Sequence, residues 1–124
     1  QIQFLKKLRE HIKEKEEEIE KLQNQMNESF TEVINLAKEN SPEFSSRFKE
    51  VYPIVYEKIL KVNPKIKTSE LTFFAYLYFG FSTKDIATYT CVTVHAVEVR
   101  KNRFRKKYNI SSDVDLNNWI EKLE

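Results

Sequence analysis

The chain has 124 residues, enough for one domain and an extended element, and 32% of them are charged. One glycine and three prolines favour a helical protein and argue against a β-sandwich or barrel. The single cysteine excludes a disulfide framework and suits a reducing compartment.

Charge is unevenly distributed along the chain, although its net value is only +2. Residues 1–40 carry 7 basic and 9 acidic side chains, and residues 111–124 carry 1 and 4. Residues 82–110 carry 7 basic and only 2 acidic side chains, a net charge of +5. A local basic excess between acidic or neutral segments favours a polyanionic partner over a role in general solubility.

Residues 1–40 predict one long helix, because neither glycine nor proline interrupts them. Eight of ten heptad seam positions are apolar; the ten are Leu5, Leu8, Ile12, Lys15, Ile19, Leu22, Met26, Ser29, Val33 and Leu36. A helix that is otherwise so polar has no core of its own, so this stripe needs a partner. We expect a parallel coiled-coil homodimer formed through Leu5, Leu8, Ile12, Ile19, Leu22 and Met26. Intramolecular packing of the stripe and a solvated helix of low stability are the alternatives.

Residues 41–67 predict a helical linker made of two short helices. Ser41 can cap the first helix with Pro42 in its first turn, and Pro53 forces a break after Tyr52. The second helix is expected to stop before Asn63. Aromatic density in this segment favours core packing over a ligand pocket, at positions Phe44, Phe48, Tyr52 and Tyr56.

The next segment, residues 71–79, is almost wholly apolar and is compatible with a buried strand or a helix. Capping residues from Thr68 to Glu70 and the only glycine, Gly80, favour a helix with a left-handed C-terminal cap. Ser82 and Asp85 then have the spacing of a capping box for a helix over residues 83–90.

Residues 81–109 predict a helix-turn-helix. Ala87 is small enough for two helix backbones to approach, and Ile86, Val92 and Val97 are expected to face inward. Cys91 occupies the turn, where many such motifs have glycine, and we expect it in the turn and the core rather than as a nucleophile.

The second helix of this motif is expected over residues 93–108, capped by Thr93. Val97, Phe104 and Tyr108 fall on its buried face, with Arg100 or Lys101 at the border. Its exposed faces combine short or polar side chains in the N-terminal half with basic ones in the C-terminal half. Phosphates attract such cations and base edges are read by such short polar groups, so the pattern predicts a recognition helix in the major groove of duplex DNA. A solvated basic helix in an ordinary bundle is the alternative.

The run from Leu71 to Leu123 resembles the C-terminal DNA-binding domain of LuxR-type (NarL/GerE-like) transcription regulators. The resemblance rests on GFSTKDIA at residues 80–87, and on Thr93, Val97 and the basic run RFRKKYN in the second helix. With the long helix in front, the chain is similar to regulators of the Bacteroidetes kind, in which a coiled coil precedes this domain. The resemblance implies a sequence-specific transcription regulator whose domain has four helices.

The same resemblance implies site residues. Base-reading positions fall on Glu98, Val99 and Asn102, and phosphate-contacting positions fall on Thr83, Lys84, Thr93, His95, Lys101, Arg103 and Lys106. Glu98 stands where better-studied members usually have lysine, and Arg100 where they often have histidine. A carboxylate can accept from a cytosine amino group, so the preferred sequence is expected to differ from theirs.

A last helix is expected over residues 112–123, with Leu116, Trp119, Ile120 and Leu123 on its apolar face. In the family the corresponding helix often makes a dimer contact on DNA. Closure of the domain core is the alternative role for these side chains.

The sequence contains no residue pattern typical of an enzyme or of a metal-binding protein. The histidines, His11 and His95, lie on different elements without a metal or triad partner, and there is no glycine-rich phosphate loop. We therefore expect no enzymatic activity, metal, cofactor or small-molecule ligand. A serious rival is a coiled-coil adaptor whose helix-turn-helix-shaped domain contacts protein rather than DNA.

The expected architecture is thus all-α, with a coiled-coil helix (1–40), a helical linker (41–67) and a four-helix DNA-binding domain (68–124). No apolar run reaches the ~18 residues that a bilayer crossing needs, and we expect a cytoplasmic location. The chain begins at Gln1 rather than Met, which predicts a fragment of a longer protein. The resemblance implies that this parent protein can be anchored in a membrane.

Overall fold

In the computed structural model residues 2–124 are described, and every regular element among them is an α-helix. The elements are α1 (Ile2–Lys38), α2 (Phe44–Val51), α3 (Pro53–Val62), α4 (Thr68–Tyr78), α5 (Thr83–Thr90), α6 (Val94–Lys107) and α7 (Leu116–Glu121). The expected all-α class and the long N-terminal helix are confirmed. None of the helices in this described range combines the length and apolar character that a membrane crossing requires.

The chain divides into two compact units, Gln1–Glu32 and Val33–Glu124. In the first unit the six apolar side chains expected at the dimer seam are all exposed, from Leu8 at 44% to Met26 at 71%. Their apolar surface is therefore left uncovered within the described part of the first unit.

The second unit contains the end of α1 together with α2 to α7. Val33 and Ala37 are fully buried in its core and Leu36 packs against that core, so the expected dimer seam does not extend to Val33 and Leu36. These side chains cannot face a partner helix because their own domain already covers them.

Residues 41–67 belong to the same unit and the same core. Phe44, Phe48 and Ile59 are buried there, and Tyr52 and Tyr56 pack against the core. The expected break at Tyr52-Pro53 is confirmed, because α2 ends at Val51 and Pro53 begins α3. The chain thus divides at residue 33, whereas we expected a separate linker over residues 41–67.

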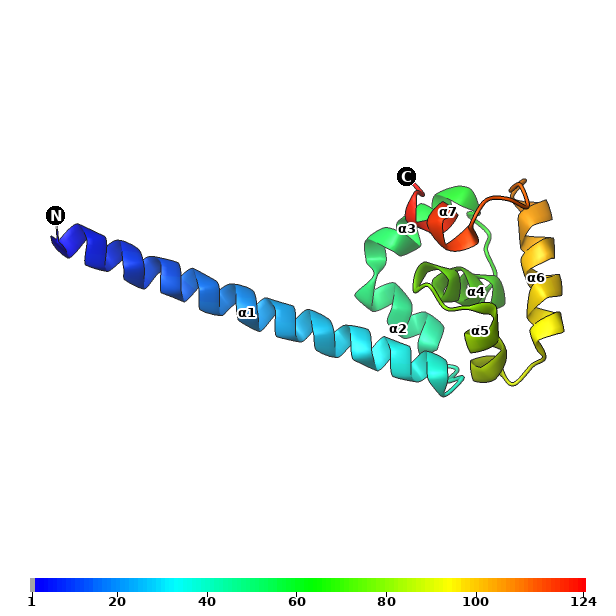
Figure 1. Ribbon diagram of the computed structural model, residues 1–124, viewed down its shortest axis with the longest axis horizontal. Helices are drawn as coiled ribbons and strands as arrows, with labels where there is room; N and C mark the ends of the chain where they lie inside the picture. The colour runs from blue at the N-terminus through cyan, green and yellow to red at the C-terminus, as the bar shows by residue number, and fades with distance from the viewer. Residues whose placement is uncertain (1) are drawn as a thin grey trace. The chain divides into compact units, whose positions relative to one another are not determined.

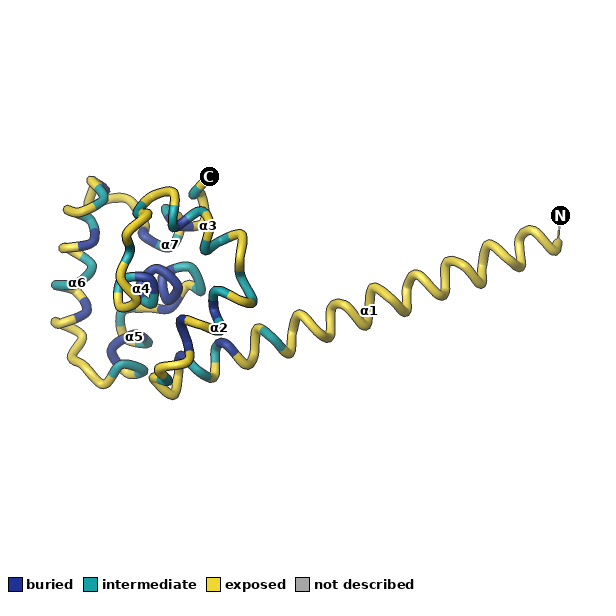
Figure 2. The backbone as a smooth tube through the Cα atoms, turned by 180° about the vertical axis from the view of Figure 1, so that it is seen from behind, coloured by how far each residue is buried: buried dark blue, intermediate teal, exposed yellow. Residues whose placement is uncertain are grey.

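Helix α4 is the centre of the second unit. Six side chains covering all sides of this helix are buried: Leu71, Phe73, Phe74, Ala75, Tyr76 and Leu77. Figure 1 shows α4 between α2 and α6, and Figure 2 shows it as the most continuously buried helix. A helix that is apolar all round must be enclosed by other elements, and the surrounding helices of the second unit enclose α4.

Four helices end in the same way, with one residue in the left-handed region: Asn40, Gly80, Cys91 and Asn109, at φ values of 52°, 76°, 57° and 54°. After α4, the Phe81 amide donates to Tyr76 O and the Gly80 amide to Leu77 O, each at 3.1 Å. The rings of Tyr76 and Phe81 lie 5.7 Å apart, the apolar contact that accompanies such an end. The left-handed cap expected at Gly80 is therefore confirmed.

Three helix starts differ from the expected ones. Lys67, not Thr68, is the N-cap of α4, and α2 begins at Phe44, with Pro42 in the preceding turn. Helix α7 begins at Leu116 rather than Ser112, because the Asp115 carboxylate accepts from the amides of Asn117 (2.8 Å) and Asn118 (3.2 Å). This cap defines a later start than the serines alone suggest.

Candidate nucleic-acid interface

Helix α5 has the expected boundaries, residues 83–90, and its start is fixed by side chains. The Ser82 hydroxyl accepts from the Asp85 amide at 3.0 Å, and the Asp85 carboxylate accepts from the Ser82 amide at 3.2 Å. This reciprocal pair is the expected capping box, and it satisfies two backbone donors at the start of the helix.

Helices α5 and α6 pack against each other through small and branched side chains. Ile86, Ala87 and Val97 are buried, as expected for a helix-turn-helix. Thr93 accepts from the Ala96 amide at 3.0 Å and is the N-cap of α6, whose bounds match the expected second helix. The sequence thus identified both helices and both of their caps.

Two side chains in the turn between these helices differ from the prediction. Val92 is 47% exposed rather than inward-facing, and the Cys91 side chain is exposed rather than part of the core. Cys91 does occupy the turn, in the left-handed conformation, and the Val92 amide donates to Ala87 O at 3.1 Å. The left-handed backbone at Cys91 changes the direction of the chain. The helical spacing of α5 therefore does not predict which side chains point inward after this residue.

The inner face of α6 rests on the aromatic side of α4. Phe104 is buried, and its ring lies 5.7 Å from that of Phe73 and 4.8 Å from that of Phe74. Trp119 of α7 closes the group, 5.9 Å from Phe104. These contacts determine which face of α6 points away from the protein.

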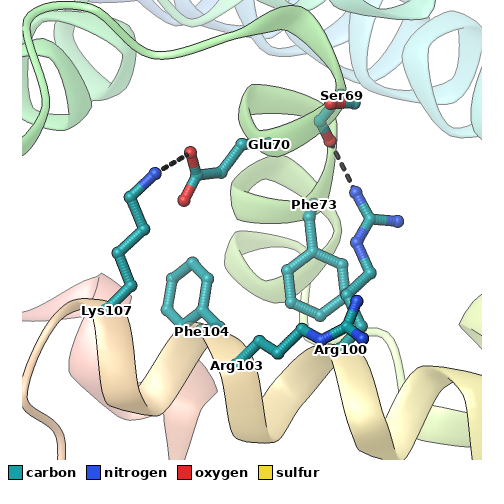
Figure 3. Close-up of a pocket in the computed structure, with 7 residues that line it drawn as sticks. All are labelled: Ser69, Glu70, Phe73, Arg100, Arg103, Phe104 and Lys107. Atoms are coloured by element: carbon teal, nitrogen blue, oxygen red, sulfur yellow. Dashed lines mark hydrogen bonds and ion pairs between the residues drawn. The ribbon is translucent and has the colours of Figure 1, made fainter.

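Four of the seven cations in residues 82–110 are hydrogen-bonded within the chain. Arg100 donates to the Ser69 carbonyl at 2.7 Å, and its guanidinium carbon lies 4.4 Å from the centre of the Phe73 ring. Lys107 donates to the Glu70 carboxylate at 2.7 Å (Figure 3). Arg105 donates to the carbonyls of Ser111 and Val114, each at 2.7 Å, and so fastens the loop before α7.

A hydrogen-bonded cluster of three polar side chains joins the ends of α3 and α6 to the start of α4. The Tyr108 hydroxyl donates to Glu70 Oε1 at 2.8 Å and accepts from Asn63 Nδ2 at 3.1 Å. Burial first, and then Glu70, raise the pKa of Tyr108 to about 12, although the Asn63 hydrogen bond acts in the opposite direction. Tyr108 therefore stays protonated at neutral pH and continues to donate to Glu70.

The fourth cation, Lys101, lies beside the start of α5, where it donates to the Thr83 hydroxyl at 2.7 Å. The structure thus brings together two residues expected to contact phosphate. Burial, and then the charge of Arg105, lower the pKa of Lys101, whereas Asp115 and Glu98 act in the opposite direction. A partly desolvated ammonium beside the positive end of a helix dipole would be stabilised by an anion.

Three exposed cations lack such a partner in the described residues. Within residues 2–124, Lys84, Arg103 and Lys106 have no hydrogen bond or ion pair with another part of the chain. All three are among the residues expected to contact phosphate. Their charges are therefore available to an external anion, unlike those of Arg100, Arg105 and Lys107.

The outward face of α6 carries the residues expected to read bases. Glu98 and Asn102 are exposed, and Val99 is partly buried between longer neighbours. Counted at 3.6 residues per turn, His95, Val99, Asn102 and Lys106 share one face, directly opposite the buried Val97 and Phe104. Glu98 lies beside this face, on the side of Lys101.

One apolar feature of this surface was predicted only in part, because helical spacing places Val94 on an exposed face whereas Val92 was expected to face inward. Val92 and Val94, which flank the Thr93 cap, are 47% and 44% exposed. Two exposed valines at the start of a recognition helix are chemically suited to contact thymine methyl groups. The left-handed residue at position 91 is the signal that could have predicted the exposure of Val92.

Helix α7 closes the core. Leu116 and Ile120 are buried, and Trp119 and Leu123 pack against the core, so Leu116 and Ile120 are not free to make the dimer contact that the family resemblance implied. Asn117 Nδ2 also donates to the Leu77 carbonyl at 2.7 Å, which ties α7 to α4.

No group of three or more His, Cys, Asp or Glu side chains in residues 2–124 could hold a metal ion. Comparisons with models of known families, with curated proteins and with solved structures give no match.

Proposed function

We propose that the second unit is a sequence-specific DNA-binding domain that inserts α6 into the major groove and belongs to a transcription regulator. The observation that carries this proposal is the division of the cations in residues 82–110. Arg100, Arg105 and Lys107 are hydrogen-bonded within the domain, whereas Lys84, Arg103 and Lys106 are exposed and have no partners in the described chain. Such exposed cations around a short polar face are what a phosphate backbone and base edges require.

The proposal assigns three kinds of contact. Glu98, Val99 and Asn102 read bases, while Lys84, Arg103 and Lys106 bind phosphates. Thr83, Thr93, His95 and Lys101 add phosphate contacts at the starts of α5 and α6, where helix N-termini favour anions. The order of the four helices from α4 to α7, the capping box at Ser82 and the cap at Thr93 support a LuxR-type domain.

We further propose that the first unit forms a parallel coiled-coil homodimer. Its apolar seam is exposed along its length, and Lys15 in this seam pairs with Glu18 at 3.4 Å, which partly neutralises the charge at that position. A dimer would present two recognition helices to a two-fold symmetric operator. In this role the chain works in the cytoplasm, where the DNA of a bacterial cell lies.

Sequence selection from random duplexes tests base reading. The whole chain should enrich one motif. Asn102→Ala and Glu98→Ala should each relax the preference at their own position by about 1–3 kcal/mol. Asn118→Ala, which alters an exposed asparagine on α7, should leave the motif unchanged.

Failure to enrich any motif, combined with absent or salt-insensitive DNA binding, would reject the proposal. That result would favour the adaptor, in which the same surface of α6 contacts an acidic protein.

A further inference from the structure

A hollow lies beside α6, on the side of the first turns of α4. It has a volume of about 200 Å³ and is lined by Ser69, Glu70, Phe73, Arg100, Arg103, Phe104 and Lys107 (Figure 3). The lining residues include three cations and one carboxylate, so the hollow has a net charge of +2. An excess of positive charge in a small volume is unfavourable unless an anion occupies it.

The three cations differ in their freedom to move. Arg100 is held by the Ser69 carbonyl and the Phe73 ring, and Lys107 is held by Glu70. Arg103 is exposed and has no hydrogen-bond partner within residues 2–124. The hollow therefore combines two fixed positive charges with one guanidinium that can reach a ligand.

Two phenylalanine rings line the hollow beside these charges. Phe73 and Phe104 lie 5.7 Å apart, and both are almost fully buried. Phe73 also stacks against Arg100, so this ring and the Ser69 carbonyl together hold the guanidinium beside the hollow.

We propose that this hollow binds one phosphate of the DNA backbone. Arg103 contacts the phosphate directly, and Arg100 and Lys107 add to the positive potential. The inference rests on the proposed function and extends it, because it gives Arg100, Lys107 and Glu70 a part in DNA binding.

The position of the hollow along α6 favours a backbone phosphate over a free anion. Arg103 directly follows Asn102 in the sequence and is one turn from Lys106. A helix in the major groove, which is about 12 Å wide, has a phosphate backbone on each side. A planar guanidinium also suits the paired oxygens of a phosphodiester.

Replacement of Glu70 should change duplex affinity in the opposite direction from the one that a purely structural role would predict. Its carboxylate offsets one of the three positive charges and holds Lys107. Replacement by glutamine keeps the size of the side chain but raises the charge of the hollow to +3. Duplex binding should then strengthen rather than weaken.

The test measures the affinity of the whole chain for duplex DNA over a range of salt concentrations. Arg103→Ala should weaken binding about tenfold and reduce the slope of log affinity against log salt by about 1. Glu70→Gln should strengthen binding several-fold and steepen the slope. Lys122→Ala and Glu57→Gln are matched controls on α7 and α3, and both should bind as the unchanged chain does. Thermal unfolding shows whether each variant is folded.

The possible failures are distinguishable. Steep salt dependence in the unchanged chain, with Arg103→Ala and Glu70→Gln both indistinguishable from it, would overturn this inference and leave the proposed function standing. Absence of salt-dependent binding in the unchanged chain would reject both. Inorganic phosphate that binds the chain without DNA and loses this binding in Arg103→Ala, while the duplex affinity of Arg103→Ala is unchanged, would assign the hollow to a free phosphate and also overturn it.

Discussion

At the scale of single residues, neighbouring cations on α6 have opposite roles because of the direction in which they point. Arg100 and Lys107 point toward α4 and donate to acceptors at 2.7 Å, whereas Arg103 and Lys106 have no acceptor within residues 2–124. Composition counts these four residues equally. Only their partners show which ones stabilise the domain and which remain available to a ligand.

Cys91 is the one left-handed position occupied by neither glycine nor asparagine. We expect Cys91→Gly to raise the free energy of unfolding by about 0.5–1 kcal/mol, because relief of the left-handed strain exceeds the added entropy of the unfolded chain. Denaturant unfolding provides the measurement. Cys91→Ala keeps the Cβ atom and should give no gain, so equal stability of the two variants would contradict this account.

The residue scale also marks a limit of prediction from sequence. Glu98 and Asn102 were placed on the exposed face by helical spacing alone, which needs only local geometry. The acceptors of Arg100 and Lys107 lie 31 and 37 positions away along the chain. No short pattern contains such pairs, because they depend on how α4 and α6 pack.

At the scale of elements, local sequence signals predicted the bounds of a helix where a capping residue and a helix break indicated the same position. The bounds of α3, α5 and α6 follow from Pro53, from the Ser82–Asp85 box and from Thr93. They failed at α7, where three polar residues before Asp115 could also serve as caps. The choice among them depends on Leu116 and Ile120 entering the core, which is a tertiary effect.

Ser82→Ala tests the energetic role of the capping box. We expect a loss of about 1 kcal/mol in the free energy of unfolding, because the Asp85 amide loses its acceptor. Thr88→Ala is the control: its hydroxyl donates to the Lys84 carbonyl inside α5, and alanine is the better helix former there. Urea unfolding of Ser82→Ala at the midpoint of the unchanged chain would show that the box does not stabilise α5.

At the scale of the whole molecule, the two units differ in what they bury. The second unit encloses a continuous core, whereas the seam residues of the first expose 44–71% of their surface. The heptad pattern predicted that exposed stripe correctly, but it also included Val33 and Leu36, which pack in the second unit. A periodic pattern cannot show where the apolar stripe of a helix begins to pack in the core of its own chain.

Sedimentation tests the proposed dimer. The unchanged chain should sediment as a dimer, and Ile12→Asp combined with Ile19→Asp should give monomers, because two carboxylates would be buried without partners. Asn24→Asp with Asn27→Asp adds the same charge at outward heptad positions and should remain dimeric. A dimer that survives the substitutions at Ile12 and Ile19 would rule out this seam.

DNA binding by the exposed cations is the central claim, and the salt dependence of duplex affinity tests it most directly. For the unchanged chain log affinity should fall steeply with log salt, and Lys84→Ala with Lys106→Ala should reduce that slope by about 2. The control variant, Lys6→Ala with Lys7→Ala, removes two exposed charges from the first unit, near the start of α1, and should keep the slope. Binding that is absent, or whose salt slope is the same in both double variants, would contradict the account.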